Sequence, residues 1–216
     1  MTVHLVHIPP LQLSADLRVP TLPRGIVIFA HGSGSSRFSP RNQAVAGALV
    51  TAGYATLLLD LLTEDEAANR ANIFDIDLLG ARLVNAIDWV RLQPGLAALP
   101  IGLFGASTGA AAAIKAAAAR GGQVRTVVSR GGRPDLAADV LGQVTAPTLL
   151  IVGGRDEPVL SWNRQAMAKL AGPAQLEIVP GATHVFEEPG AMEEVVRLSI
   201  AWFDDTLAVS ARADAR

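Results

Sequence analysis

The chain has no cysteine and no marked excess of charge. The missing cysteine excludes disulfide bonds, a thiolate nucleophile and a cysteine-ligated metal, and it fits a reducing compartment. The 18 basic and 20 acidic side chains leave a formal net charge of −2, and no concentrated basic face is evident. We therefore expect neither nucleic acid nor an anionic membrane surface as a partner.

Long apolar runs are also missing. No segment approaches the about 18 consecutive apolar residues that a membrane-spanning helix needs. The N-terminal segment MTVHLVH lacks the basic start, the apolar centre and the small-residue cleavage site of a signal peptide. These two absences predict a cytoplasmic location and no membrane contact.

The composition favours one globular domain. Half of the 216 residues are hydrophobic and 18% are charged, so a packed core is expected rather than disorder. No internal repeat or linker divides the chain. We predict a single domain over residues 1–207 and a frayed C-terminal tail over residues 208–216.

The chain opens with two predicted strands, at 3–8 and 11–19. Alternate residues of the second strand are apolar, which suits an antiparallel pair with one face in water. These residues are Leu11, Leu13, Ala15, Leu17 and Val19. Continuously apolar segments then predict buried parallel strands at 25–30, 56–59, 100–104, 124–129, 147–152 and 175–179. Predicted helices separate them at 40–52, 75–92, 108–119, 135–142, 161–172 and 189–207.

This alternation predicts the α/β class, with a mostly parallel, doubly wound sheet and an antiparallel N-terminal strand pair. The polar connection 63–74 and the other loops are short, so little or no lid domain is expected. In such sheets, ligands bind beyond the carboxyl ends of the strands. Functional residues should therefore directly follow the predicted strands.

A serine follows the strand at 100–104 in this way. Ser107 is the centre of Gly105-Ala106-Ser107-Thr108-Gly109 and is followed by an alanine-rich helical segment. A Gly-x-Ser-x-Gly segment between strand and helix is typical of the nucleophile elbow of α/β-hydrolases. The glycines are needed because side chains there would collide with the neighbouring strand and helix. Ser107 is therefore the predicted nucleophile, rather than an ordinary turn residue.

An acid and a histidine follow the last two strands. Asp156 lies in Gly153-Gly154-Arg155-Asp156, and His184 lies in Gly181-Ala182-Thr183-His184. A histidine can take the serine proton, and a carboxylate can fix the histidine tautomer. Asp135 is the alternative acid. We favour Asp156 because its loop and the Pro-Val that follows match the commoner position.

The loop after the first parallel strand completes the predicted site. It reads His31-Gly32-Ser33-Gly34-Ser35-Ser36. In α/β-hydrolases this loop supplies one oxyanion-hole N–H, and the residue after the nucleophile supplies the other. We assign these donors to the backbone of Ser33 and Thr108. His31 is interpreted as a structural residue with no part in proton transfer.

With these four motifs, at 31–34, 105–109, 153–156 and 181–184, the chain resembles the dienelactone hydrolase-like group of α/β-hydrolases. The resemblance extends over about residues 20–205. It implies the α/β-hydrolase fold, a Ser-His-Asp triad, and no metal or organic cofactor. Dienelactone hydrolases proper use a cysteine nucleophile, which this chain lacks. A serine esterase is therefore expected rather than an enzyme that hydrolyses dienelactone.

Other side chains near the strand ends have two interpretations each. Arg37, Arg41, Arg130 and Arg133 could bind a substrate carboxylate or phosphate, but surface ion pairs are the favoured interpretation. Arg37 and Arg130 are the better candidates for substrate binding from their positions. Trp162 and Phe186 flank the acid and histidine loops, where they either line the pocket or pack in the core.

The predicted function is hydrolysis of a small-molecule carboxylic ester or thioester by Ser107, His184 and Asp156 through an acyl-enzyme. One alternative is acyl transfer to an acceptor other than water. Another is a non-catalytic ligand-binding or interaction protein on the same fold. The sequence leaves the substrate and the oligomeric state open.

Overall fold

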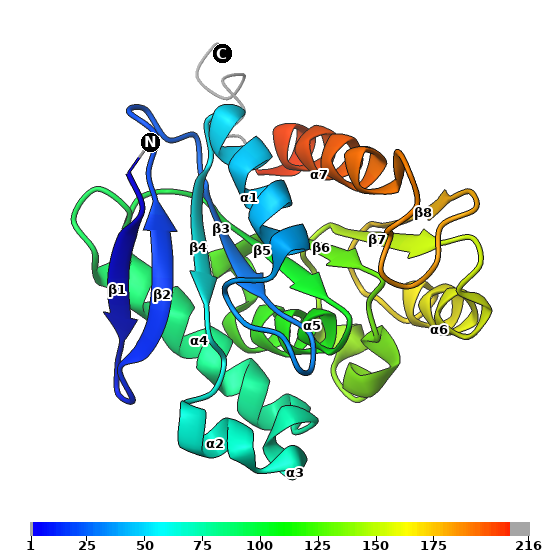
Figure 1. Cartoon of the computed structure of the whole chain (residues 1–216), viewed down its shortest axis with the longest axis horizontal. Coiled ribbons are helices and arrows are strands. Elements are labelled where there is room, and N and C mark those ends of the chain that lie inside the picture. Colours follow the sequence, from blue (N-terminus) through cyan, green and yellow to red (C-terminus); the bar gives the residue numbers. More distant parts are fainter. Residues whose placement is uncertain (1, 208–216) are drawn as a thin grey trace.

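The structure is a computed structural model that describes residues 2–207 (Figure 1). The predicted tail at 208–216 lies outside the described residues. One eight-stranded sheet has the strand order β1-β2-β4-β3-β5-β6-β7-β8. The strands are β1 (His4–Ile8), β2 (Leu13–Arg18), β3 (Ile26–Ala30), β4 (Ala55–Leu59), β5 (Ile101–Ala106), β6 (Val124–Arg130), β7 (Thr148–Gly153) and β8 (Ala174–Val179). The α-helices are α1 (Pro40–Thr51), α2 (Glu64–Ala68), α3 (Arg70–Ile73), α4 (Ile76–Leu92), α5 (Thr108–Arg120), α6 (Glu157–Met167) and α7 (Ala191–Thr206).

The strand pairing confirms the predicted mixed sheet. β1 pairs antiparallel with β2, and β2 pairs antiparallel with β4. The remaining neighbours, from β4 across to β8, are parallel. Leu13, Ala15 and Leu17 of β2 are buried, as their alternation predicts. Leu11 and Val19 lie outside the strand and are 41% and 38% exposed, so the predicted alternation ends sooner at both sides.

Helices cover both faces of the parallel strands (Figure 1). Along β3, Ile26, Ile28 and Ala30 belong to the core that includes side chains of α4 and α5. Val27 and Phe29 belong to the core that includes side chains of α1 and α7. Burial from two sides explains why these strands are apolar without alternation. Among the helices of residues 2–207, none combines the length and apolar character that a bilayer crossing requires.

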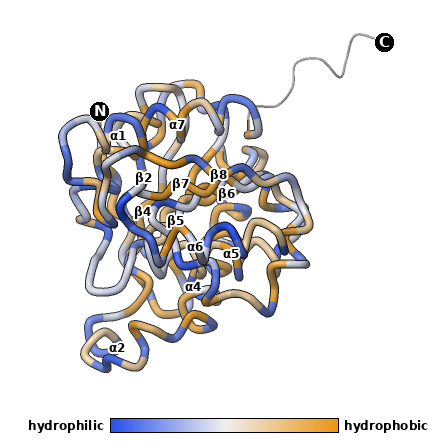
Figure 2. The backbone as a smooth tube through the Cα atoms, turned by 90° about the vertical axis from the view of Figure 1, so that its right-hand side faces the viewer, coloured by the Kyte–Doolittle hydropathy of each residue, from blue (hydrophilic) through white to orange (hydrophobic). Residues whose placement is uncertain are grey.

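The segment 63–74 folds into α2 and α3, so the prediction of a plain connection is wrong. Thr63 and Glu66 form a capping box: the Glu66 N–H donates to the Thr63 hydroxyl and the Thr63 N–H to the Glu66 carboxylate. The two short helices project from the rest of the chain beyond the carboxyl end of β4 (Figure 1 and Figure 2). They add a wall next to the strand ends.

The predicted helix at 135–142 is also absent. The chain there makes two short 3₁₀ turns, at Pro134–Ala137 and Leu141–Gln143. A helix shorter than about 12 residues is marginal without strong packing, and Gly142 lowers the helix propensity further.

The helix predicted at 161–172 begins earlier and ends sooner, as α6. Asp156 takes the N-cap position and Pro158 lies in the first turn, where a proline has no N–H to lose. The expected start at Ser161 is therefore wrong. This shift places Asp156 at the junction of strand and helix.

Candidate active site

Ser107 stands on a strained turn between β5 and α5. Its backbone has φ 51° and ψ −122°, a region that residues other than glycine rarely adopt. A Cβ at Gly105 would lie 2.4 Å from the Ala110 Cα, and one at Gly109 would lie 2.3 Å from the Ala30 carbonyl oxygen. Both positions therefore require glycine, and the tight packing holds the serine in its turn.

The three residues predicted as a triad meet in space. His184 Nε2 lies 3.2 Å from Ser107 Oγ, and His184 Nδ1 lies 2.6 Å from Asp156 Oδ2. The carboxylate accepts a hydrogen bond from the Nδ1–H of His184, which leaves Nε2 without a proton and able to accept a hydrogen bond from the serine hydroxyl. Asp135, the alternative acid, instead forms an ion pair with Arg133 at 2.7 Å. Of the two candidate acids, Asp156 is therefore the one that contacts His184.

Backbone hydrogen bonds join the acid loop to the histidine loop. The Arg155 N–H donates to the Ala182 carbonyl and the Gly154 N–H to the Val179 carbonyl, both at 2.9 Å. A Cβ at Gly153 would lie 2.5 Å from the Ala182 oxygen, so glycine permits this close approach. The Asp156 side chain is 12% exposed and that of His184 is 41% exposed. The carboxylate is therefore shielded, while the imidazole is open to solvent and substrate.

The two predicted oxyanion donors lie next to each other. Thr108 is the first residue of α5, where a backbone N–H has no partner within the helix. The Ser33 N–H donates to the Thr108 hydroxyl at 2.8 Å. A Cβ at Gly32 would lie 3.1 Å from the Ser107 Cβ, so the loop passes close to the serine. Stabilising an oxyanion with Ser33 requires its N–H to exchange the threonine hydroxyl for the substrate oxygen.

His31 holds the start of this loop. Its Nδ1 lies 3.0 Å from the Gly32 carbonyl oxygen, and the Leu61 N–H donates to its Nε2 at 3.1 Å. Burial lowers the pKa of His31, although the Gly32 carbonyl and Asp60 oppose this shift. A neutral ring with a proton on Nδ1 satisfies both contacts. The geometry agrees with the structural interpretation of this residue.

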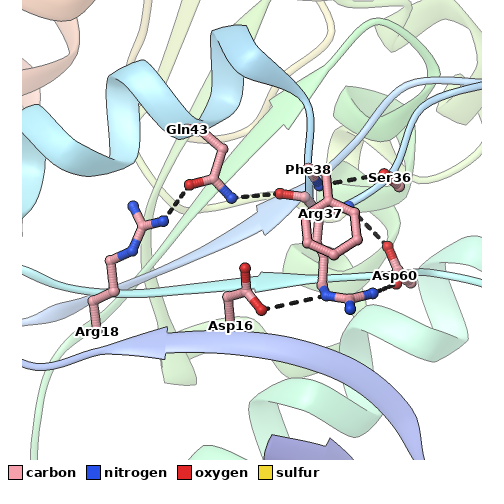
Figure 3. A network of polar contacts seen from close by, with 7 residues as sticks. All are labelled: Asp16, Arg18, Ser36, Arg37, Phe38, Gln43 and Asp60. Carbon is pink, nitrogen blue, oxygen red and sulfur yellow. Dashed lines mark hydrogen bonds and ion pairs between the residues drawn. The ribbon is translucent and has the colours of Figure 1, made fainter. Parts of the chain in front are cut away.

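Figure 3 shows how Arg37 ties the same loop to the sheet. Its guanidinium forms ion pairs with Asp16 of β2 and with Asp60 after β4. The Arg37 N–H donates to Asp60 Oδ1 at 2.8 Å, and Gln43 Nε2 donates to the Arg37 carbonyl at 2.7 Å. Arg18 in turn donates to Gln43. We call Asp16, Arg37 and Asp60 the loop clamp. Because two carboxylates already neutralise Arg37, it is less suited to bind an anionic substrate than Arg130.

Arg130 has a different setting. It is 7% exposed, its carbonyl accepts the Ser107 N–H at 3.2 Å, and its Nη2 lies 3.3 Å from Asn42 Oδ1. Its guanidinium carbon lies 5.9 Å from the centre of the Phe186 ring. Phe186 itself is fully buried, which agrees with the core interpretation.

The remaining aromatic candidate lies against an arginine. The Arg133 guanidinium lies 4.0 Å from the centre of the Trp162 ring, while the same arginine pairs with Asp135. Trp162 is partly buried and packs against the cluster of Val159 and Leu160. This arrangement favours packing over substrate contact for Trp162.

Two cavities flank residues 32–35. One, of about 240 Å³, is lined by Ser107, His184, Arg41, Arg130 and their neighbours. The other, of about 300 Å³, is lined by the apolar side chains of Phe38, Leu62, Ile73 and Leu79, and at its border by polar residues that include Arg37, Asp60 and Glu64. Sequence reasoning missed the second cavity because α2 and α3, which wall it, were taken for a plain connection. We call these the polar cavity and the apolar cavity.

Comparison with known proteins supports the fold and identifies the family. The family model described as the dienelactone hydrolase family matches residues 13–207. The crystal structure of dienelactone hydrolase from Anabaena variabilis is 50% identical, covers 95% of this chain and 97% of its own, and has a TM-score of 0.91. Est1E from Butyrivibrio proteoclasticus, at 16% identity and a TM-score of 0.80 over 95% of this chain and 98% of its own, has the same fold.

Two curated relatives from Mycobacterium tuberculosis, each named a putative phosphoribosyl transferase, are 60% identical over 198 residues. The match covers 92% of this chain but 45% of each relative, so the chain spans less than half of their length. The family match and the 50% identical structure lead to one assignment: the chain has the α/β-hydrolase fold and belongs to the dienelactone hydrolase family.

Proposed function

We propose that this hydrolase cleaves a carboxylic ester or thioester with Ser107 as its nucleophile. The observation that carries the proposal is the hydrogen-bonded series from Asp156 through His184 to Ser107, with the serine on a strained elbow. A serine hydroxyl is a weak nucleophile at neutral pH unless a base takes its proton. His184 Nε2 is placed to be that base.

In the first half-reaction, Ser107 Oγ attacks the carbonyl carbon and its proton moves to His184 Nε2. The carbonyl π electrons move to the oxygen, which the N–H groups of Thr108 and Ser33 stabilise. Asp156 stabilises the imidazolium that forms. The tetrahedral intermediate then collapses, the bond to the leaving alkoxide or thiolate breaks, and His184 gives the leaving group its proton.

In the second half-reaction, water replaces the alcohol or thiol. His184 takes a proton from the water, whose oxygen attacks the acyl-enzyme carbonyl. The second tetrahedral intermediate releases the carboxylic acid, and the proton returns from His184 to Ser107 Oγ. The 41% exposure of the His184 side chain supports access of water to this position.

The apolar cavity favours a substrate that carries a small or medium-sized apolar group. It is bordered by Gly32 and Ser33, which also border the polar cavity that contains Ser107. An ester bound at Ser107 is therefore able to extend past Ser33 toward Leu62 and Ile73. Burial of such a group contributes about 25 cal/mol per Å² of apolar surface.

The name of the curated relatives suggests a different reaction, phosphoribosyl transfer. Those proteins are more than twice as long as the matched segment, and the name describes the whole protein. The residues of this chain form a Ser-His-Asp arrangement that suits acyl chemistry. We therefore propose ester hydrolysis for this chain and make no assignment for the rest of those relatives.

The test compares Ser107→Ala with the matched control Ser161→Ala, an exposed serine of α6. With p-nitrophenyl butyrate as substrate, we expect kcat/KM of Ser107→Ala to fall by about 10³-fold or more. A fluorophosphonate probe should label the wild type and Ser161→Ala but leave Ser107→Ala unlabelled. Hydrolysis at the wild-type rate in Ser107→Ala would contradict the triad. An unlabelled, inactive wild type would favour a non-catalytic binding protein.

A further inference from the structure

Two arginines of the polar cavity have no acidic partner. Arg130 comes from the end of β6 and Arg41 from the first turn of α1, and both line the cavity with Ser107 and His184. Among residues 2–207, no carboxylate forms an ion pair with either guanidinium. The Nε atoms of both arginines are buried without a hydrogen-bond partner. A buried arginine normally has its charge paired, so this arrangement requires a cause.

The two cations also act on each other. Burial, followed by the charge of Arg41, lowers the pKa of Arg130 to about 10. Arg130 therefore remains protonated at neutral pH, at a cost to the folded state. A bound anion would offset this cost, because opposite charge favours the charged form of the group.

The other groups around the polar cavity are suited to an anion with several acceptor oxygens. Asn42 accepts from Arg130 through Oδ1, so its amide NH₂ is available as a donor. Ser33 and Ser35 add hydroxyl groups to the lining. The helix α1, of 12 residues, begins at the cavity after its N-cap Ser39, and its positive dipole end favours anions.

We propose that the polar cavity is an anion subsite that binds a phosphate group of the substrate through Arg41 and Arg130. The inference rests on the proposed ester hydrolysis for the nature of the scissile bond. Two unpaired guanidiniums carry two positive charges, and a phosphate monoester carries nearly two negative charges at pH 7. A carboxylate would neutralise only one of the two positive charges. The substrate class is accordingly a phosphorylated ester or thioester, held by its phosphate while Ser107 attacks the carbonyl.

The first test measures binding of inorganic phosphate by titration calorimetry, which does not depend on hydrolysis. We expect phosphate to bind the wild type and each of Arg41→Gln and Arg130→Gln to weaken binding by about tenfold or more. The control Arg164→Gln removes an exposed arginine of α6 and should bind like the wild type. Arg41 is only partly buried near a helix start, so Arg41→Gln tests the subsite even where Arg130→Gln fails to fold.

The second test compares three p-nitrophenyl esters of equal chain length that end in a methyl, a carboxylate or a phosphonate group. We expect the phosphonate ester to have at least about a tenfold higher kcat/KM than the methyl ester, and Arg130→Gln to remove this advantage. Equal kcat/KM for the three esters overturns the subsite, as does a preference for the carboxylate over the phosphonate.

The two proposals fail in different ways. If the methyl ester is hydrolysed with dependence on Ser107 but phosphate does not bind, the subsite is overturned and the ester hydrolase remains. If phosphate binds with dependence on Arg41 and Arg130 while no ester is cleaved, the subsite is supported and the proposed hydrolysis fails.

Discussion

The loop at residues 32–38 borders two regions that contain arginine, the loop clamp and the polar cavity. The arginine of the loop clamp has acidic partners, whereas those of the polar cavity have none among residues 2–207. In the loop clamp, Arg37 lies between Asp16 and Asp60, with side-chain exposures of 17%, 13% and 21%. In the polar cavity, Arg41 and Arg130 lie beside Ser107 without any carboxylate partner in residues 2–207. A paired arginine holds a structure together, whereas an unpaired buried arginine costs stability and is retained where it binds something.

The largest effect that tests this comparison is expected from the loop clamp. Replacing Arg37 by Met leaves Asp16 and Asp60 partly buried without their cation. We expect the free energy of unfolding to fall by about 3 kcal/mol, as measured by urea denaturation at pH 7. The triple variant Arg37→Met, Asp16→Asn, Asp60→Asn should recover part of the loss, because no charge is left unpaired. A single variant as stable as the wild type would mean that the clamp contributes nothing.

The matching substitution in the polar cavity should have the opposite sign. Arg130→Met removes a buried cation that lacks an acid, so we expect the free energy of unfolding to stay constant or rise by about 1 kcal/mol. The comparison is made in the same urea titration, without phosphate in the buffer. Adding phosphate should then stabilise the wild type but not Arg130→Met. A loss as large as that of Arg37→Met would contradict the contrast between the two regions.

The smallest effect concerns His31, which directly precedes the loop at residues 32–38. Burial lowers its pKa in the folded state, so below about pH 6.5 the unfolded chain binds the proton more readily. The stability that a neutral His31 provides is therefore present above that pH and is lost as the pH falls. We expect the wild type to lose up to about 1 kcal/mol more than His31→Gln between pH 7.5 and pH 5. Equal losses in the two proteins would show that His31 does not titrate on unfolding.

The sequence predicted which strands precede the candidate site residues, but it did not predict the ion pairs of the arginines around them. Ser107, Asp156 and His184 each follow a buried strand, and the carboxyl ends of parallel strands share one edge, so their meeting was predictable. The partners of Arg37 were not predictable, because Asp16 lies on β2 and Asp60 directly after β4, and the pairing of these two strands depends on the sheet order. For the same reason, nothing in the sequence separates the paired Arg37 from the unpaired Arg130.

The errors in the fold have local causes. The capping box of Thr63 and Glu66 is a helix-start signal in the sequence, and the prediction of a plain connection overlooked it. The apolar cavity was not predicted for the same reason, because α2 and α3 form one side of it. The start of α6 at Glu157 was missed because Ser161 resembles an N-cap, although Pro158 in the first turn already marks an earlier start.

The antiparallel pair at the start of the chain has a consequence for engineering. β2 carries Asp16, which holds Arg37, and β1 covers the open edge of β2 through the register from His4–Leu17 to Ile8–Leu13. The family match begins at residue 13, so it includes β2 but not β1. β1 therefore protects the edge of β2, the strand that anchors the loop beside Ser107 through Asp16 and Arg37. We expect removal of β1 to leave the edge of β2 open to pairing with other chains. It would also weaken the support that Asp16 gives to Arg37 and to the loop at residues 32–38.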